Sequence, residues 1–394
     1  MAQGYNNLSR LRIFDHVIRW MYSVAGFTLK IRDSFGLPVE VHQAKIAIVS
    51  PAAIGDFIMA LKAMVLVRRN LPSAKIIILA RGGSISNEIG GMFQVGDKYI
   101  CFKSSMSFSE KARSVVSLIN FGPDIVVNLE PENFRYTALC ILLSAPKKRI
   151  GITRVGTWNS VQSPIYNVNI DSEKNEMDRY VAAVKPLLSK HQWEDHHLFS
   201  IRMPNINNLT LGLNRHLPQD SNNGILIAIQ PGSSSHQKWK RWPEDKYRDL
   251  VKRLVQSNIG LVVLIGSMEE RNLCGRIAGL NKKSVYNLAG QLGIGETIAL
   301  IQKSAIVICN DSSGMHLAAL VGVSAIVIYG PTDPARTKPR IQSILGIRSG
   351  ISCSPCFSPD NSENAENCPI NYRCLTEIEP QLVFKKITNI LLRK

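Results

Sequence analysis

A stretch of sequence near residue 310 does most to restrict what this chain can fold into. Ile306 to Cys309 is an uninterrupted apolar run, and a second run starts at Ala325 after a segment of helical character. Runs that are apolar at every position are typical of parallel strands covered on both faces. Between them, the polar residues 310–313 come directly before a helix that we expect to begin near Gly314. The pattern predicts a strand, a polar turn, a helix and a second strand.

The start of this helix is a candidate anion site. A helix that begins at the carboxyl end of a parallel strand directs free N–H groups and a positive dipole end at the crevice above the sheet. Ser312, Ser313, Gly314 and His316 lie in that turn, which suits a phosphate or diphosphate. The alternative is an ordinary capped turn in which His316 is a satisfied structural residue.

Similar runs recur along both halves of the chain. We expect strands at 45–49, 75–80, 124–129 and 149–152 in the first half and at 225–230 and 260–265 in the second, with helical patterns between them. Alternation of this kind predicts parallel sheets, and 394 residues are comfortable for two domains. The expected class is α/β, with two Rossmann-like doubly wound domains that face a central cleft.

The domain boundaries follow from this pattern. We expect a basic amphipathic extension at 1–43, a first domain at 44–190, a linker at 191–223 and a second domain at 224–394 that ends in a cysteine-containing segment and a helix. In the extension, apolar residues recur at helical spacing among basic ones: Leu11, Phe14, Ile18, Met21 and Val24. Such a helix can lie on a membrane or pack back on the protein, and the pattern fits both.

The amino-acid composition limits the classes of molecule that this chain can bind. A hydrophobic fraction of 45% with 20% charged residues describes a folded chain, and the net charge of +17 suits nucleic acid, an anionic membrane or an anionic ligand. The sequence has no Arg-rich block and no zinc-finger spacing, so we expect no nucleic acid partner. It also has no apolar run long enough to span a membrane and no signal peptide, which predicts a cytoplasmic protein.

Three further places carry candidate functional residues. Asp56 follows the first expected strand, where a carboxylate can cap a helix or act as a general base. The loop from Gln230 to Glu244 offers Ser233 and Lys240 to a diphosphate, although a solvated basic loop has the same composition. Glu269 and Glu270 follow another strand, where a carboxylate can bind ribose hydroxyls or simply lie exposed at a helix start.

Four of the eight cysteines lie close together near the C-terminus. Cys353 and Cys356 have the C-x-x-C spacing, and Cys368 and Cys374 follow them. This spacing fits a structural metal site of thiolate ligands, but the gap within the second pair is longer than usual, so free thiols are an equal alternative.

The residues at 310–334 closely resemble the C-terminal signature of the ADP-heptose:lipopolysaccharide heptosyltransferases, glycosyltransferase family 9. Asn310 to Ser312, Gly314 to Ala319 and Gly330 to Pro334 match that signature as they stand. Gly55-Asp56 and Lys240 to Pro243 resemble two further motifs of the family. Gln230 departs from it, because the family commonly has His there.

The resemblance implies a GT-B glycosyltransferase that inverts the anomeric carbon and needs no cofactor for catalysis. Asp56 would be the base. Lys240, the helix start at 312–316 and Thr332 would hold the diphosphate of an ADP-heptose-like donor, and Asp311 would bind donor hydroxyls. The acceptor would be a lipid-linked or core-oligosaccharide hydroxyl, and the enzyme would contact the anionic inner face of the inner membrane.

The resemblance is weaker in the first half. Ser50 and Lys62 replace residues that the family often has, and Asn128 to Pro131 depart from its "DLQG"-like segment. Since the first domain binds the acceptor in this architecture, the donor is the safer inference. Two other classes stay open: a sugar-nucleotide epimerase or hydrolase of the same fold, and a non-catalytic basic protein that binds a membrane surface or nucleic acid.

Overall fold

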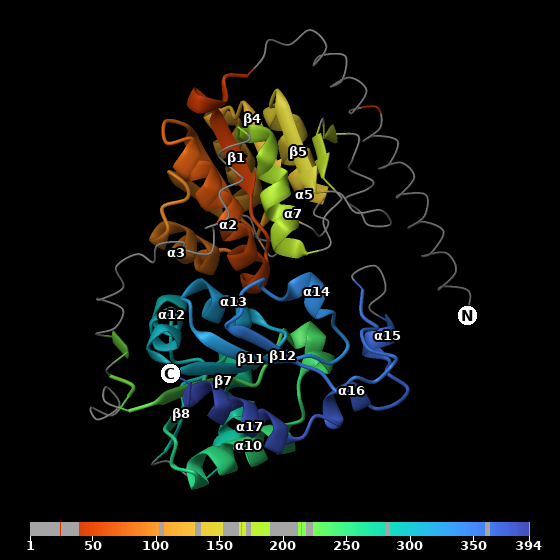
Figure 1. Ribbon diagram of the computed structural model, residues 1–394. Coiled ribbons are helices and arrows are strands. Elements are labelled where there is room, and N and C mark those ends of the chain that lie inside the picture. The colour runs from red at the N-terminus through yellow and green to blue at the C-terminus, as the bar shows by residue number, and fades with distance from the viewer. Residues whose placement is uncertain are drawn as a thin grey trace. The chain divides into compact units, whose positions relative to one another are not determined.

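The computed structural model describes residues 24, 39–101, 106–130, 135–152, 165–166, 168–170, 175–189, 212–213, 215–217, 224–279, 284–358 and 363–393. The chain divides into two compact units, Met1–Leu198 and Phe199–Lys394, and each unit contains one parallel sheet of six strands (Figure 1). The predicted class, two doubly wound α/β domains, is confirmed. The apolar residues of the expected N-terminal helix, except Val24, lie outside the described residues, as does most of the linker predicted at 191–223.

The first unit alternates strands and helices along the chain. Its elements are β1 (Lys45–Val49), α2 (Ile54–Asn70), β2 (Lys75–Ala80), α3 (Ser84–Met92), β3 (Lys98–Cys101), α4 (Phe108–Phe121), β4 (Ile125–Asn128), α5 (Arg135–Ser144), β5 (Lys148–Ile152), β6 (Val168–Ile170) and α7 (Glu176–Val184). The strand order is β3-β2-β1-β4-β5-β6. The order reverses between β1 and β4, the point where doubly wound sheets bind ligands.

Helices cover both faces of this first sheet. On one face, α2 and α7 lie side by side (Figure 1), and α2 is buried along most of its length, which explains why its sequence is apolar almost all round. On the other face, α4 and α5 contribute Val115, Leu118, Ala138 and Ile141 to a cluster with the strands. The sheet is therefore apolar on both sides, as its uninterrupted strands predict.

The second unit repeats the topology. Its elements are β7 (Leu226–Gln230), η5 (Ser235–Lys240), α10 (Glu244–Gln256), β8 (Leu261–Leu264), η6 (Met268–Glu270), α11 (Arg271–Ala278), β9 (Val285–Asn287), α12 (Ile294–Lys303), β10 (Ile306–Asn310), α13 (Ser313–Leu320), β11 (Ser324–Ile328), α14 (Pro334–Thr337), β12 (Ile344–Ile347), α15 (Glu363–Glu366), α16 (Arg373–Thr376) and α17 (Pro380–Leu391). The strand order is β12-β11-β10-β7-β8-β9, which reverses between β7 and β10.

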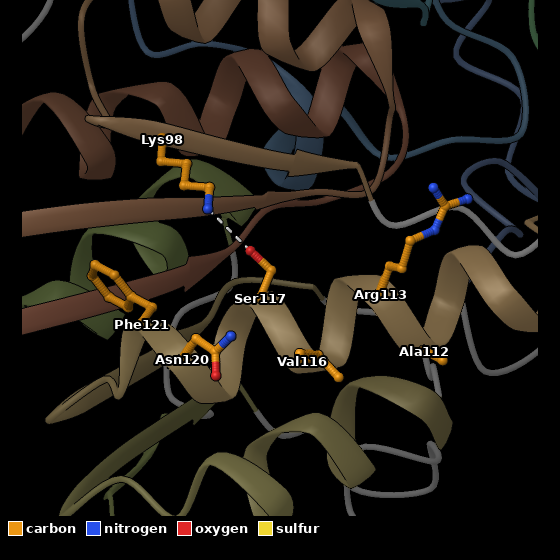
Figure 2. A pocket seen from close by; sticks show the side chains of 7 residues that line it. All are labelled: Lys98, Ala112, Arg113, Val116, Ser117, Asn120 and Phe121. Atoms are coloured by element: carbon orange, nitrogen blue, oxygen red, sulfur yellow. Dashed lines mark hydrogen bonds between the residues drawn. The ribbon is translucent and has the colours of Figure 1, made fainter.

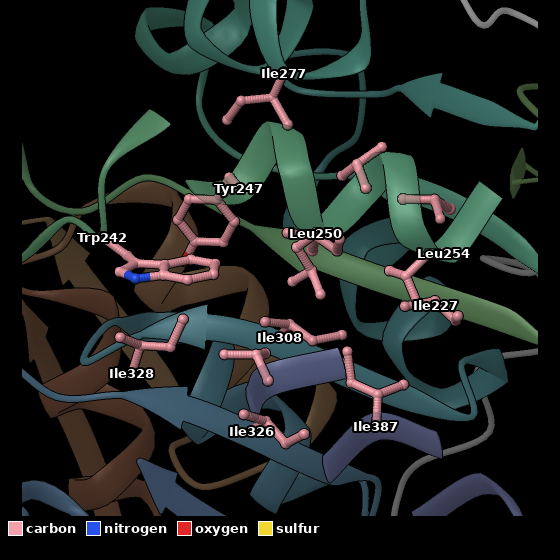
Figure 3. Packing of buried hydrophobic residues seen from close by; sticks show 14 of the residues in the cluster. Ile227, Trp242, Tyr247, Leu250, Leu254, Ile277, Ile308, Ile326, Ile328 and Ile387 are labelled. Carbon is pink, nitrogen blue, oxygen red and sulfur yellow. The ribbon is translucent and has the colours of Figure 1, made fainter. Parts of the chain in front are cut away.

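The core of the second unit lies between its sheet and the helices α10 and α17 (Figure 3). Trp242 and Tyr247 are fully buried there, with ring centroids 4.9 Å apart in an edge-to-face arrangement. The indole N–H of Trp242 donates to the carbonyl of Ile378 at 3.1 Å. This bond ties the segment before α17 to the start of α10.

The strands expected from the sequence are all present, and four more lie at the sheet edges. β3, β6, β9 and β12 have only three or four residues. In β3 and β12 buried and exposed positions are mixed, so the sequence shows no continuous apolar run. None of the helices in the described ranges combines the length and the apolar character that crossing a membrane requires.

Candidate functional site

The predicted donor residues of the second unit gather at the carboxyl ends of β7 and β10. These neighbouring strands end at Gln230 and Asn310. A polar loop follows each of them, one running through η5 to Lys240 and the other leading into α13. The site therefore lies at the topological switch point, where open α/β sheets bind their ligands.

The side chain of Asn310 joins the two loops that follow β7 and β10. Its side-chain oxygen accepts hydrogen bonds from the backbone N–H of Trp242 and the hydroxyl of Tyr247, both at 2.9 Å. Its amide group donates to the carbonyls of Pro231 at 2.8 Å and Gly232 at 3.0 Å. These four bonds use the whole capacity of a side-chain amide. Asn310 is thus a buried structural tie and not the helix cap that its position suggests.

The cap of α13 comes from Gln230 on the neighbouring strand. Its side-chain oxygen accepts from the backbone N–H of Gly314 at 2.7 Å and from the hydroxyl of Ser312 at 3.1 Å. Its amide group donates to the hydroxyl of Ser313 at 3.2 Å. A Cβ atom at Gly314 would clash with that oxygen, so any other residue here would displace the Gln230 side chain from its capping position. Ser312, the N-cap residue, makes no side-chain cap bond.

Lys240 and Asp311 form a loose ion pair at the centre of the site. Their charged atoms are 3.6 Å apart, and both side chains are largely buried. The ammonium group of Lys240 also lies 5.5 Å from the ring centroids of Trp239 and Phe357, whose faces attract a cation. The two predicted residues therefore meet, with the lysine held between aromatic rings and the carboxylate.

Several buried polar atoms of this site have no hydrogen-bond partner among the described residues. They are Asp311 Oδ2, His316 Nδ1, Thr332 Oγ1 and Trp239 Nε1. Leaving such an atom unsatisfied costs about 1–3 kcal/mol, so folded proteins rarely do it without a reason. Three of the four belong to residues predicted from the sequence to hold the donor. No motif or spacing singles out Trp239, although it lies directly before the predicted Lys240.

His316 is neutral in this environment. Burial lowers the pKa of its imidazole to about 4; the Lys240 charge acts in the same direction, whereas the Asp311 carboxylate opposes it. At neutral pH the ring therefore has one N–H donor and one acceptor nitrogen. It can hydrogen-bond a polar ligand but does not add positive charge to the site.

Ser233 and Arg241 brace the loop that carries Lys240. The guanidinium of Arg241 donates to the Ser233 hydroxyl at 3.1 Å and to the Ser233 carbonyl at 2.6 Å. The hydroxyl itself donates to the carbonyl of Gln237 at 2.9 Å. The hydroxyl of Ser233, a predicted phosphate-binding residue, thus already makes hydrogen bonds within the loop. Its phosphate-binding role stays a prediction.

The two candidate ribose residues have different environments. Glu270 is buried, accepts from the backbone N–H of Ser267 at 2.8 Å in a capping box, and lies 3.7 Å from the guanidinium of Arg241. Glu269 is exposed to solvent. Glu270 therefore stabilises the loop and helix start, while Glu269 keeps its carboxylate free for solvent or a ligand.

A segment after β12 supports the signature turn at 330–332. The backbone N–H of Cys356 donates to the carbonyl of Pro331 at 3.0 Å, and the hydroxyl of Ser354 donates to the carbonyl of Gly330 at 2.7 Å. Leu375 packs so closely that a Cβ atom at Gly330 would stand 2.5 Å from it. The cysteine-containing segment thus fixes the turn that presents Thr332.

The four cysteines of this segment are near one another. Burial, with the neighbouring Cys356, Cys368 and Cys353 thiols, raises the pKa of Cys374 to about 11. The backbone N–H of Tyr372 donates to the sulfur of Cys368 at 3.3 Å. In the part of the chain that the structure describes, however, no three Cys, His, Asp or Glu side chains are grouped to hold a metal ion. The thiols are neighbours and not an assembled ligand set.

Asp56 lies in the first unit, in the first turn of α2 after β1. It is half-buried, and a carboxylate there interacts favourably with the positive end of the helix. At the same carboxyl edge, Arg81 and Glu130 form a short ion pair of 2.7 Å, and Glu130 is buried. Glu130 belongs to the segment in which the sequence departs from the "DLQG"-like pattern.

Comparison with known proteins identifies the family to which these features belong. The model of glycosyltransferase family 9 (heptosyltransferase) matches residues 120–366. Lipopolysaccharide heptosyltransferase 2 of Escherichia coli (strain K12) is 30% identical over 173 residues, which cover 43% of this chain and 47% of that protein. The chain spans about half the length of the curated relatives it matches first.

Solved structures share the fold over most of the chain. The structure of E. coli ADP-heptose lps heptosyltransferase II has a TM-score of 0.70 at 22% identity and covers 89% of this chain and 99% of that one. E. coli heptosyltransferase WaaC with ADP has a TM-score of 0.63 at 17% identity, covering 88% of this chain and 99% of that one. At this level of identity the likeness concerns the two-domain fold.

Proposed function

Because the chain belongs to glycosyltransferase family 9, the heptosyltransferase family, we propose that it transfers a heptose, or a similar sugar, from an ADP-activated donor to a hydroxyl of a lipopolysaccharide-core or related glycan acceptor. The observation that carries the proposal is a set of buried polar atoms without hydrogen-bond partners on Asp311, His316 and Thr332, together with the Lys240 cation 3.6 Å from Asp311. A ligand that carries both hydroxyl donors and acceptor oxygens would satisfy all of them, with a hydroxyl donating to the Asp311 carboxylate.

The donor diphosphate is proposed to bind at Lys240 and the start of α13. Lys240 supplies a full positive charge, and the helix adds the partial positive charge of its N-terminus. Charge grows on the leaving diphosphate as the sugar departs, so a preorganised cation there stabilises the transition state more than the ground state. Asp311 is proposed to bind donor hydroxyls, and His316 and Thr332 to complete the hydrogen bonds.

Asp56 is proposed as the general base. A half-buried carboxylate at the carboxyl edge of the first sheet can take the proton from the attacking hydroxyl. One displacement with one base and one stabilised leaving group inverts the anomeric carbon. No cofactor enters this chemistry. The acceptor is proposed to be lipid-linked, so the reaction would take place at the cytoplasmic face of the inner membrane, which cell fractionation tests.

The cysteine segment carries a separate proposal of a structural metal ion that takes no part in catalysis. The C-x-x-C spacing and the mutual effect of the four thiols support it. Metal analysis of protein purified without chelators tests it: about one equivalent that is lost on substitution of Cys353 and Cys356 by Ser supports the site, and metal-free, fully stable protein rejects it.

The decisive experiment measures donor binding and acceptor-dependent transfer on the same preparation. Calorimetry with ADP and with UDP should show selective binding of ADP, which Lys240→Ala weakens by roughly 100-fold or more because the diphosphate then loses its cation and faces the Asp311 carboxylate. Lys238→Ala is the matched control, since Lys238 belongs to the same loop but is exposed. Equal loss in both variants would reject the assigned site.

Product analysis separates the remaining enzyme classes. A glycosyltransferase releases ADP from ADP-heptose only at a rate that rises with added acceptor. Release of free sugar at the same rate without acceptor would identify a hydrolase, and conversion of the sugar while it stays on the nucleotide would identify an epimerase. Absence of nucleotide binding altogether would favour a non-catalytic protein.

A further inference from the structure

We propose that the outward side of α4 and α5 is a docking surface for an anionic phospholipid membrane. This surface, the α4–α5 face, is defined by five exposed apolar side chains: Phe108, Val116, Ile119, Leu139 and Leu143. The α4–α5 face lies in the first unit. The proposal rests only on the exposed side chains and charges of this face. It does not depend on the donor chemistry proposed above.

The two helices turn these side chains away from the sheet. Val115 and Leu118 of α4, with Ala138 and Ile141 of α5, pack into the same cluster on one face of the first sheet, and the two helices contact each other. Residues three or four positions apart share a side of a helix. Val116 and Ile119 therefore share the outward side of α4, and Leu139 and Leu143 share the outward side of α5.

These side chains are highly exposed to solvent and are grouped on two neighbouring helices. Phe108 is 87% exposed, Val116 54%, Ile119 43%, Leu139 46% and Leu143 51%. They are half of the ten exposed large hydrophobic side chains in the described ranges, and the other five are spread over the rest of the chain. A group of this kind marks an interaction site, whereas single exposed apolar residues need no explanation.

A helix of the second unit shows what an ordinary outward face looks like. On α10 the apolar residues are buried, and the outward positions carry charges that pair along the helix, as in Arg248–Glu244 at 2.8 Å and Arg253–Asp249 at 2.9 Å. By contrast, α5 is apolar on its buried and its outward side. A helix that is apolar all round is normally covered on both sides.

Cations border the α4–α5 face. A hollow of about 520 Å³ lies beside α4 and is lined by Lys98, Ala112, Arg113, Val116, Ser117, Asn120 and Phe121 (Figure 2). The ammonium group of Lys98 donates to the hydroxyl of Ser117 at 3.0 Å, and Arg113 extends from α4 into solvent. Val116 belongs to both the hollow and the apolar face, so positive charge directly adjoins apolar surface.

The acidic residue of α4, Glu110, interacts with the Arg113 charge but has other hydrogen-bond donors of its own. Glu110 is held at the helix start, where it accepts hydrogen bonds from the hydroxyl of Ser107 at 2.7 Å and its backbone N–H at 2.8 Å. Apolar side chains next to exposed cations match the boundary between acyl chains and anionic head groups. A second copy of this chain fits less well, because a two-fold contact over this face would gather the bordering cations of both copies in one interface.

Vesicle flotation of the full-length protein tests the proposal. Vesicles of phosphatidylethanolamine with phosphatidylglycerol are compared with vesicles of phosphatidylcholine. Val116→Asp with Leu143→Asp should lower binding to the anionic vesicles at least tenfold, since a carboxylate is repelled and apolar contact is lost. Lys98→Gln and Arg113→Gln should each lower it about fivefold, and high salt should remove their effect.

Helix α17 provides matched controls. Leu382 is exposed there to a similar degree as Ile119, and Lys386 is an exposed cation. Leu382→Asp and Lys386→Gln should bind the anionic vesicles as the unaltered protein does. Circular dichroism and thermal unfolding establish that each variant is folded before its binding is compared.

Three results would overturn the proposal. The first is unchanged vesicle binding in all α4–α5 variants, which would place any membrane contact elsewhere in the chain. The second is an equal loss in the α17 controls. The third is a change in molecular mass by light scattering, without a change in vesicle binding, which would identify the face as a contact between copies of the chain.

Discussion

The carboxyl edges of the two sheets have the same topology but different polar arrangements. In the second unit, Lys240 and Asp311 are 3.6 Å apart and Asp311 Oδ2 has no hydrogen-bond partner among the described residues. In the first unit, Arg81 and Glu130 form a short ion pair of 2.7 Å. The pair of the second edge is thus too long for a hydrogen bond, whereas the pair of the first edge is hydrogen-bonded. Shared topology therefore does not give the same polar contacts.

The largest expected effect tests whether the first edge takes part in chemistry at all. Asp56→Asn keeps the shape of the side chain but removes the base, so the transfer rate should fall about 10²- to 10⁴-fold while ADP binding is unchanged. Stopped assays of ADP release and calorimetry measure the two quantities. Glu88→Gln, an exposed carboxylate of α3, is the control. A normal transfer rate in Asp56→Asn would assign the base to another residue.

A second prediction compares the two ion pairs by stability. Arg81→Ala leaves the buried Glu130 carboxylate without its close cation and should lower the free energy of unfolding by about 3–5 kcal/mol. Lys240→Ala should cost about 1 kcal/mol, because its pair is long. Urea unfolding of both variants measures the difference. Equal costs would mean that the two edges do not differ in the way described.

The third prediction concerns acid stability of the second edge. The pKa of His316 is about 4 in the folded state and lies near 6.5 in an unfolded chain, so the unfolded state binds a proton first. The stability tied to neutral His316 is complete above about pH 6.5 and is lost as the pH falls towards 4, by on the order of 3 kcal/mol.

The matching variant is His316→Asn, which cannot take up that proton. Its free energy of unfolding should fall less steeply between pH 6.5 and 4 than that of the unaltered protein, whatever its value at neutral pH. Urea unfolding over this pH range gives both slopes. Identical slopes would show that His316 titrates normally in the folded state, and the site would then be open to water.

The smallest expected effect concerns the helix cap. Gln230→Ala removes the acceptor for the Gly314 N–H and should destabilise the protein by about 1 kcal/mol. Thermal unfolding measures it, with Gln302→Ala on the exposed side of α12 as the control. If Gln230→Ala is neutral, water replaces the cap and the helix start is freely accessible.

The sequence anticipated the parts of the fold that repeat a simple pattern. Uninterrupted apolar runs predicted β1, β2, β4, β7, β8, β10 and β11 within a residue or two of their observed bounds. The edge strands β3 and β12 were missed because they are short and bury only some of their side chains. An uninterrupted apolar run reveals a strand only when helices cover both faces of the sheet at that strand.

Within the site, the sequence predicted which residues lie close together but not which hydrogen bonds they make. The resemblance to family motifs predicted that Lys240 and Asp311 belong to one site, and in the structure they form an ion pair. Nothing local in the sequence indicates that Gln230 caps a helix 84 residues further on, or that Asn310 binds Trp242 across 68 residues. Likewise, Glu269 and Glu270 are equivalent in sequence, and only the fold turns Glu270 inward.

The four hydrogen bonds of Asn310 have a consequence for laboratory evolution of the protein. They fix the segment between β7 and the start of α10 through Trp242, Tyr247 and the carbonyls that follow β7. A library that varies Thr332 and His316 while it keeps Asn310 would change polar contacts of the site on an unchanged loop backbone. Replacing Asn310 itself would remove all four hydrogen bonds and release both loops together.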